Sequence, residues 1–207
     1  MIENKILVPE SLYNSSNDFR PLIPFKQWDA YGLMNRNGEI VVNAIYDTIS
    51  EDIYADYLFV KVGKVHPYYY KNGENVSVHW CYLYGIVNYL GKIVLDTIYR
   101  EIKISSDQHF FTVKDTNLEY SILNVVRDVV IPAGKYAFID GVERGLARVY
   151  KYNERGEKKW GIINMKGEEI VPLKYDEMWN FWGHNLETTR VMESGVEFQI
   201  VLPNQFE

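Results

Sequence analysis

The fold is decided by the stretch Trp160-Gly161-Ile162-Ile163-Asn164-Met165-Lys166-Gly167, because it is the last of several copies of one pattern. Residues 31–38 and 84–91 fit the same template without a gap, and residues 120–124 form a shorter copy. The template reads aromatic, Gly, aliphatic, variable, Asn, two variable residues and Gly. A Tyr follows fifteen positions after the first aromatic, at Tyr46, Tyr99 and Tyr175. A repeated unit of this kind predicts a repeat protein.

The spacing of the copies favours a β-propeller. The first aromatic residues stand at positions 31, 84, 120 and 160, so the intervals are 53, 36 and 40 residues. These bracket the roughly 40 to 50 residues of a propeller blade. No segment shows the period of an amphipathic helix, so we expect an all-β fold.

Each unit divides into about four short apolar runs separated by turn residues, which predicts four short strands. In the second unit the expected strands are residues 58–62, 84–88, 92–95 and 100–104. In the third they are residues 110–113, 120–124, 128–131 and 136–139. In the fourth they are residues 146–149, 160–164, 169–171 and 177–179.

The two ends of the chain look like complementary parts of one more unit. Ile6–Pro9 resembles Ile170–Pro172 and reads as a third strand, with Ser11–Tyr13 as a fourth. Residues 189–192 and 198–201 read as a first and a second strand. We therefore expect residues 1–207 to form one domain, a five-bladed propeller-like ring closed by its N- and C-terminal strands. An open β-repeat array is the alternative.

The Asn and the second Gly of the template predict a tight hairpin turn. The Asn side chain can bond nearby backbone, and Gly takes the position with positive φ. Asn35 with Gly38, Asn88 with Gly91, and Asn164 with Gly167 follow this rule. Arg127 replaces the Gly in the third copy, so we expect that turn to be built differently.

On these residues the units resemble WG repeats, bacterial tandem modules that read aromatic-Gly-aliphatic, Asp or Asn, Gly-Lys/Glu, an aliphatic pair and Tyr-Asp. The match is carried by Trp160-Gly161, Asn164, Gly167-Glu168, Ile170-Val171 and Tyr175-Asp176, and by Tyr31-Gly32, Asn35, Gly38-Glu39, Val41-Val42 and Tyr46-Asp47. It runs from about Phe25 to Glu177. The resemblance implies no catalytic residues and no fixed ligand.

Composition excludes several classes of partner. The chain is 47% hydrophobic and 15% aromatic, which predicts an ordered globular protein. A net charge of −6 argues against nucleic acid and favours a basic partner. The first ten residues hold only a three-residue apolar run and no apolar stretch approaches about 18 residues, so we expect neither a signal peptide nor a membrane span. Cys81 is the sole cysteine, so we expect a cytoplasmic protein.

An insertion in the second unit is the first candidate for a binding surface. It runs from Lys64 to Trp80 and accounts for the 53-residue interval. Lys71-Asn72-Gly73-Glu74 is a tight-turn signal, which predicts a protruding hairpin. Exposed Tyr and Trp dominate binding hot spots. The candidate binding residues are Tyr68, Tyr69, Tyr70, His79 and Trp80; packing of these rings against the body is the alternative.

A second aromatic group follows the fourth unit. It consists of Trp179, Phe181 and Trp182, close to Asp176 and Glu177. These rings are candidates for the same binding role, with core packing as the competing interpretation, since Trp is usually buried.

We identify no catalytic residue, metal site or cofactor. His79 and Cys81 share a face of one strand, but no third group completes a nucleophilic site. The four histidines lack metal-binding spacing. Carboxylate pairs such as Glu51 with Asp52 and Glu168 with Glu169 could serve glycoside cleavage, but adjacent residues on a strand face opposite ways.

The sequence therefore predicts a non-enzymatic protein-binding module, for example an inhibitor or immunity-type protein that covers a toxin. Its partner is expected to be another protein. The alternative function is carbohydrate binding or glycoside chemistry, because propeller faces rich in aromatic rings can stack on sugars. A purely structural repeat in a larger complex is a third possibility.

Overall fold

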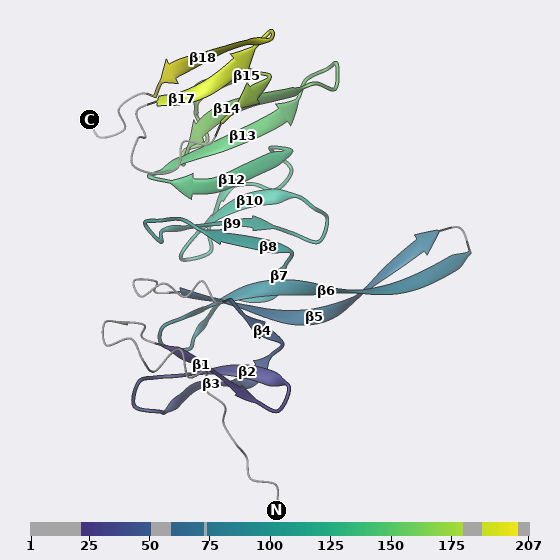
Figure 1. Ribbon diagram of the computed structural model, residues 1–207, viewed down its shortest axis with the longest axis vertical. Helices are drawn as coiled ribbons and strands as arrows, with labels where there is room; N and C mark the ends of the chain where they lie inside the picture. The colour runs from purple at the N-terminus through teal and green to yellow at the C-terminus, as the bar shows by residue number, and fades with distance from the viewer. Residues whose placement is uncertain (1–21, 51–58, 73, 180–187, 203–207) are drawn as a thin grey trace, which may run out of the picture. The chain divides into compact units, whose positions relative to one another are not determined.

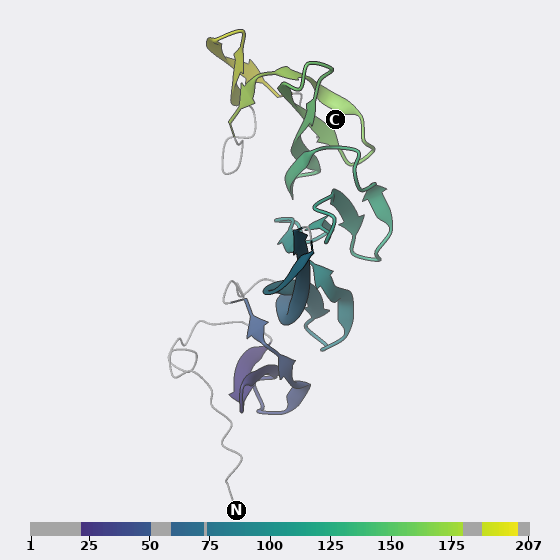
Figure 2. The same cartoon turned by 90° about the vertical axis from the view of Figure 1, so that its right-hand side faces the viewer.

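The structure of this protein is a computed structural model that describes residues 22–50, 59–72, 74–179 and 188–202. These residues form strands and turns and no helix, as Figures 1 and 2 show, so they contain no helix that could cross a membrane. The strands make five small antiparallel sheets, and no sheet closes into a barrel. The prediction of an all-β repeat protein is confirmed.

The chain divides into two compact units, Met1–Ile102 and Lys103–Glu207. Two sheets lie in the first unit. The first sheet consists of β1 (Ile23–Gln27), β2 (Ala30–Met34) and β3 (Ile40–Tyr46), in that order. The second consists of β4 (Thr48–Ile49), β5 (Phe59–Asn72), β6 (Asn75–Asn88) and β7 (Ile93–Tyr99).

Three further sheets follow along the chain, and each keeps its strands in sequence order. The third consists of β8 (Glu101–Ile104), β9 (Phe110–Lys114), β10 (Tyr120–Asn124) and β11 (Val129–Ile131). The fourth consists of β12 (Phe138–Glu143), β13 (Leu146–Tyr152), β14 (Lys158–Asn164) and β15 (Glu169–Tyr175). The fifth consists of β16 (Glu177–Met178), β17 (Thr188–Glu193) and β18 (Val196–Val201).

The grouping of strands into sheets differs from the prediction by one strand. The run at residues 100–104, expected to be the last strand of the second repeat, supplies β8, the first strand of the third sheet. Likewise residues 177–179 supply β16 of the fifth sheet rather than the end of the fourth. Residues 189–192 and 198–201 do lie in strands, β17 and β18. The predicted strands Ile6–Pro9 and Ser11–Tyr13 lie outside the described residues.

The Tyr-Asp pair explains why the chain changes sheet. Tyr46 and Tyr175 are the last residues of their sheets and pair with the first aromatic residues of the same copies, Tyr31 and Trp160. The following Asp then bonds to the next sheet. Asp47 Oδ2 accepts a hydrogen bond from the backbone N–H of Val65 at 2.7 Å, and Asp176 Oδ2 accepts one from Ser194 at 2.8 Å.

Within each compact unit, the hydrophobic core lies between consecutive sheets. In the first unit, Leu33 and Val42 of the first sheet form one cluster with Val60 and Val62 of the second. In the other unit, Ile122 of the third sheet packs with residues of the fourth, and Ile162 of the fourth packs with Val191 of the fifth. A fully buried aliphatic side chain stabilises the fold by about 1.5–3 kcal/mol. Within each compact unit, adjacent sheets are therefore held together by apolar layers.

The first Gly of the first, second and fourth copies permits a close approach between strands. Trp160 pairs with Tyr175 and Ile162 with Val171, so β15 bulges opposite Gly161. A Cβ at Gly161 would lie 2.6 Å from the carbonyl oxygen of Val171. The same clash would arise at Gly85, 2.5 Å from the Leu95 oxygen. In the third copy β11 pairs only with Ile122 and Leu123, so Ser121 faces no such bulge in the described ladder.

The Asn turn is built as expected. Asn164 Oδ1 accepts hydrogen bonds from the backbone N–H groups of Lys166 at 2.9 Å and Glu168 at 3.0 Å. Gly167 donates to the Asn164 backbone oxygen and has a φ of +79°. The first and second copies repeat these contacts around Asn35 and Asn88.

The prediction that the third turn is built differently was wrong. Asn124 Oδ1 accepts from Val126 at 3.1 Å and Asp128 at 2.8 Å, and Arg127 donates to the Asn124 backbone oxygen. Arg127 takes the position of the Gly with a φ of +74°. The Asn side chain therefore dictates the turn, and the non-Gly residue bears the strain of the left-handed conformation.

We expect Gly161→Ala to lower the free energy of unfolding by about 1–3 kcal/mol, because the new methyl group must displace the Val171 carbonyl. Denaturant titration monitored by Trp fluorescence measures the change. The control is Ser121→Ala at the equivalent position of β10, which should change stability by less than about 1 kcal/mol. An unfolding midpoint of Gly161→Ala equal to that of wild type would contradict the assignment.

We expect Arg127→Gly to raise the free energy of unfolding by about 0.5–1 kcal/mol, because relief of the left-handed strain exceeds the added chain entropy of Gly. Gly167→Arg makes the reciprocal change in the fourth sheet and should destabilise the protein by about 1 kcal/mol. The two variants are compared in one denaturant series. A loss of stability in Arg127→Gly would show that its side chain makes contacts that outweigh the strain.

Candidate protein-binding surface

The insertion forms a long β-hairpin that extends beyond its sheet. β5 and β6 pair continuously from Phe59 with Asn88 to Asn72 with Asn75. Their neighbours are shorter: β4 reaches only Gly63 on β5, and β7 reaches only Tyr84 on β6. Past these points the hairpin is a two-stranded ribbon, as Figure 1 shows, and no described strand pairs with either edge. The predicted protruding hairpin is confirmed.

One side of this ribbon is an exposed apolar face, which we define by Tyr69, Val76, Val78, Trp80 and Tyr82. Residues directly opposite in an antiparallel ladder share a face, and the side chains alternate along each strand. Tyr69 lies opposite Val78, and Trp80 lies opposite Pro67. The exposed fractions are 66% for Tyr69, 68% for Trp80, 60% for Val76, 50% for Val78 and 46% for Tyr82. Five large apolar side chains therefore lie together in solvent.

The opposite side of the ribbon is more polar and partly covered. Tyr68 pairs with His79 in the ladder, and the Arg100 guanidinium lies 5.1 Å from the Tyr68 ring centroid. His79 Nε2 lies 3.0 Å from Ser77 Oγ. Cys81 Sγ lies 3.8 Å from the backbone oxygen of His66. The thiol thus contacts a carbonyl group, and the imidazole two residues away contacts a hydroxyl group.

The hairpin residues predicted to bind a partner therefore divide between two faces. Tyr69 and Trp80 lie on the apolar face, whereas Tyr68 and His79 lie on the other. Tyr70 occupies the ladder position opposite Ser77. The sequence interpretation missed Val76, Val78 and Tyr82. The alternation Val76-Ser77-Val78-His79-Trp80 contains the signal, because every second residue from Val76 to Tyr82 is apolar.

The second predicted group is only partly described. Trp179 is half-buried, donates its backbone N–H to Arg190 and has the Arg190 guanidinium 5.1 Å from its ring centroid. Phe181 and Trp182 lie outside the described residues. Trp179 also lines a pocket of about 460 Å³ with Trp160, Arg148 and Glu177. The Arg148 guanidinium lies 4.8 Å from the Trp160 ring centroid, so each Trp has an Arg over one ring face.

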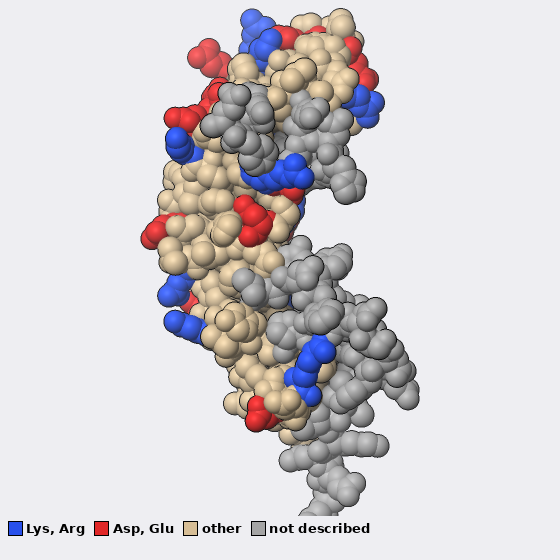
Figure 3. Space-filling model, turned by 90° about the vertical axis from the view of Figure 1, so that its left-hand side faces the viewer, with Lys and Arg blue, Asp and Glu red and all other residues tan. Residues whose placement is uncertain are grey.

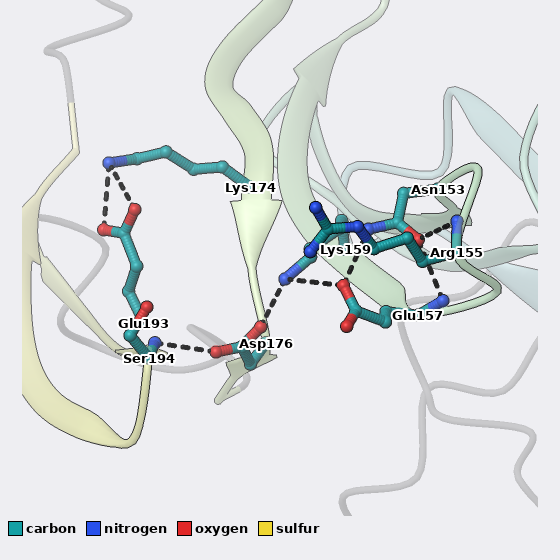
Figure 4. Close-up of polar contacts among 8 residues, drawn as sticks. All are labelled: Asn153, Arg155, Glu157, Lys159, Lys174, Asp176, Glu193 and Ser194. Carbon is teal, nitrogen blue, oxygen red and sulfur yellow. Dashed lines mark hydrogen bonds and ion pairs between the residues drawn. The ribbon is translucent and has the colours of Figure 1, made fainter.

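Charged groups near this pocket connect neighbouring sheets through an ion pair and hydrogen bonds. Lys159 Nζ lies 2.5 Å from Asp176 Oδ1, and the close-up in Figure 4 shows Asp176 between Lys159 and the Ser194 backbone. The hydrogen bond from Lys159 and that from Ser194 lower the pKa of Asp176 below its ordinary value. A carboxyl group held ionised in this way is poorly suited to act as the general acid of glycoside cleavage.

A second cluster of ion pairs lies inside the same compact unit, around Asp140. Asp140 is buried, with Lys103 Nζ 3.0 Å from Oδ1 and Arg148 Nη2 2.7 Å from Oδ2. Burial acts to raise the pKa of Asp140, but the hydrogen bonds and positive charges of Lys103 and Arg148 outweigh it and lower the pKa. Arg148 also donates to the backbone oxygen of Met178 at 2.6 Å. The cluster therefore connects the third, fourth and fifth sheets.

Charge is balanced in the described part of the molecule. Of 22 basic and 28 acidic residues, two basic and eight acidic ones lie outside the described ranges, which accounts for the whole net charge of −6. The face drawn in Figure 3 shows basic and acidic side chains interspersed. Among the described residues, no group of three His, Cys, Asp or Glu side chains has the arrangement of a metal site. The predicted preference for a basic partner therefore depends on residues outside the described ranges.

Comparisons with known proteins identify the repeat. The family model of the WG containing repeat matches residues 31–65 and 160–186. The first match begins in β2 and ends in β5, so one repeat extends over two sheets. No curated protein matches the sequence. The chain is similar to a solved protein of unknown function from Bacteroides caccae, at 11% identity and a TM-score of 0.29, over 84% of this chain and 67% of that chain. The resemblance seen in Tyr31-Gly32 and Trp160-Gly161 is confirmed: this chain contains the WG containing repeat at residues 31–65 and 160–186.

Proposed function

We propose that this protein is a non-enzymatic protein-binding module whose docking surface is the apolar face of the β5–β6 hairpin. The observation that carries the proposal is the exposure of Tyr69 and Trp80, 66% and 68%, side by side with Val78 on one face of a ribbon. Contiguous exposed apolar patches of this kind mark interaction sites. Tyr and Trp are also the residues that most often dominate the binding energy of interfaces.

The shape of the surface favours a protein over a small ligand. A small molecule is usually held in a concave pocket that buries most of its surface. The apolar face lies on a two-stranded ribbon and is therefore open, whereas the pocket at Trp160 and Trp179 has an Arg over one face of each ring. That arrangement gives carbohydrate binding less support than protein binding. An inhibitor or immunity-type protein is one form that such a module takes within this proposal.

We expect Tyr69→Ala to reduce the amount of partner captured from a native cell lysate by at least about tenfold, because it removes an anchor of the apolar face. Tyr68→Ala is the matched control, since it removes the neighbouring Tyr from the opposite face. Both tagged full-length variants are compared with wild type by quantitative mass spectrometry, after their melting temperatures are shown to match. Equal capture by all three proteins would overturn the proposal.

We also propose that the repeats close into a five-bladed, propeller-like ring. The fifth sheet supports this, because it has three strands and its last strand, β18, exposes Val196 at 62% and Val201 at 78%. In the complete sheets of the same unit, the strand that corresponds to β18 is followed by a fourth strand such as β15. Ile6–Pro9 resembles Ile170–Pro172 of β15 and is the segment proposed to supply that fourth strand.

Ring closure predicts that the backbone amides of β18 exchange slowly with solvent in the full chain and at least about tenfold faster in a chain that lacks residues 1–13, because the unpaired strand edge becomes exposed. Hydrogen exchange followed by mass spectrometry measures this, with β14 as the internal reference strand. Identical exchange of β18 in the two chains would favour the open array.

A further inference from the structure

We infer that the occupant of the apolar face is a second copy of this chain, which packs its own hairpin face to face against the first. The inference rests on the proposed function and names the partner of that same surface. Pairing of two identical faces by a two-fold axis is the commonest form of protein oligomer. Three features of the hairpin fit such a contact.

The first feature is the lack of charge in the middle of the face. From Tyr69 and Val78 to Tyr82, the residues of the face and their ladder partners Val65 and Pro67 are all uncharged. The charged ladder positions are Lys71, opposite Val76 at the tip, and Lys61 beyond the base. In a two-fold contact each residue meets the same surface of its partner, so a charged face would oppose like charges and repel. The uncharged middle of the face has no such penalty. It also gives no electrostatic preference for a basic or an acidic foreign protein.

The second feature is the ribbon itself. A single two-stranded hairpin in water is only marginally stable, whereas sheets that cover one another's apolar faces are stable. Beyond Gly63 and Tyr84 the hairpin has no further strand in its sheet. Two such ribbons stacked about 10 Å apart would form a small four-stranded sandwich. The stacked rings of Tyr82 and Tyr84, with centroids 6.3 Å apart, would extend its apolar layer toward the base of the hairpin.

The third feature is the size of the face. A Tyr or Trp side chain presents about 150–250 Å², so the exposed parts of the five residues amount to about 550 Å² per chain. A symmetric pair would then bury about 1,100 Å², which reaches the roughly 1,000 Å² needed for a specific interface and stays in the range of weak, reversible dimers.

The test compares Trp80→Glu with His79→Glu in the full chain. Both substitutions add the same charge to β6, one on the apolar face and one on the opposite face. Light scattering should give wild type and His79→Glu a mass approaching twice 24.3 kDa at high protein concentration. Trp80→Glu should stay at the mass of one chain, with a dissociation constant at least about 100-fold weaker. Circular dichroism confirms that both variants are folded.

The other outcomes separate this inference from the proposed function. A wild-type protein that stays monomeric, but loses a lysate partner in Tyr69→Ala, would overturn the second copy as occupant and leave the docking role intact. A monomer whose captured proteins do not depend on Tyr69 would overturn both. A dimer that persists in Trp80→Glu would place the interface elsewhere and also overturn the inference.

Discussion

The close approach of a glycine to a bulged strand is the constraint on which the rest of the structure depends. At Gly161 the backbone of β14 lies against the Val171 carbonyl, where any side chain would collide. The approach allows β15 to bulge and still return its last residue, Tyr175, to pair with Trp160. Asp176 is thereby delivered to the next sheet, where it accepts a hydrogen bond from Ser194. The first sheet ends in the same way, because Tyr46 pairs with Tyr31 and Asp47 accepts a hydrogen bond from Val65.

Much of the fold follows from local rules that can be recognised in sequence. The Asn-x-x-Gly turn depends on nearby residues, so the sequence predicted it. The Tyr fifteen residues after each first aromatic was visible in the sequence, but the structure revealed that the two residues pair. The assignment of strands to sheets depends on whether β16 pairs with β15 or with β17. Both choices satisfy the same period-two pattern, and the hydrogen bonds of Asp176 decide between them. Arg127 shows the converse, because a favourable Asn turn imposed a left-handed conformation that composition alone argued against.

The candidate surface was only partly predictable for a related reason. A run such as Tyr68-Tyr69-Tyr70 predicts that at least one ring is exposed. Which of these rings shares a face with Trp80 depends on the register of the hairpin. A shift of one residue would exchange the two faces. A single Val does not indicate a binding residue, so Val76 and Val78 were not predicted, yet they make the apolar face continuous. The described residues are electrically balanced, so the expected preference for a basic partner stays a prediction.

The offset between repeat and sheet also bears on how such chains grow. The segment matched at residues 31–65 starts in the second strand of one sheet and ends in the second sheet, so a gene duplication of one repeat adds parts of two sheets. Each inserted copy would consequently share a sheet with both of its neighbours and pair with them through backbone hydrogen bonds. Lengthening the array therefore requires no new interface between copies, because each repeat already contains the strands that pair with its neighbours.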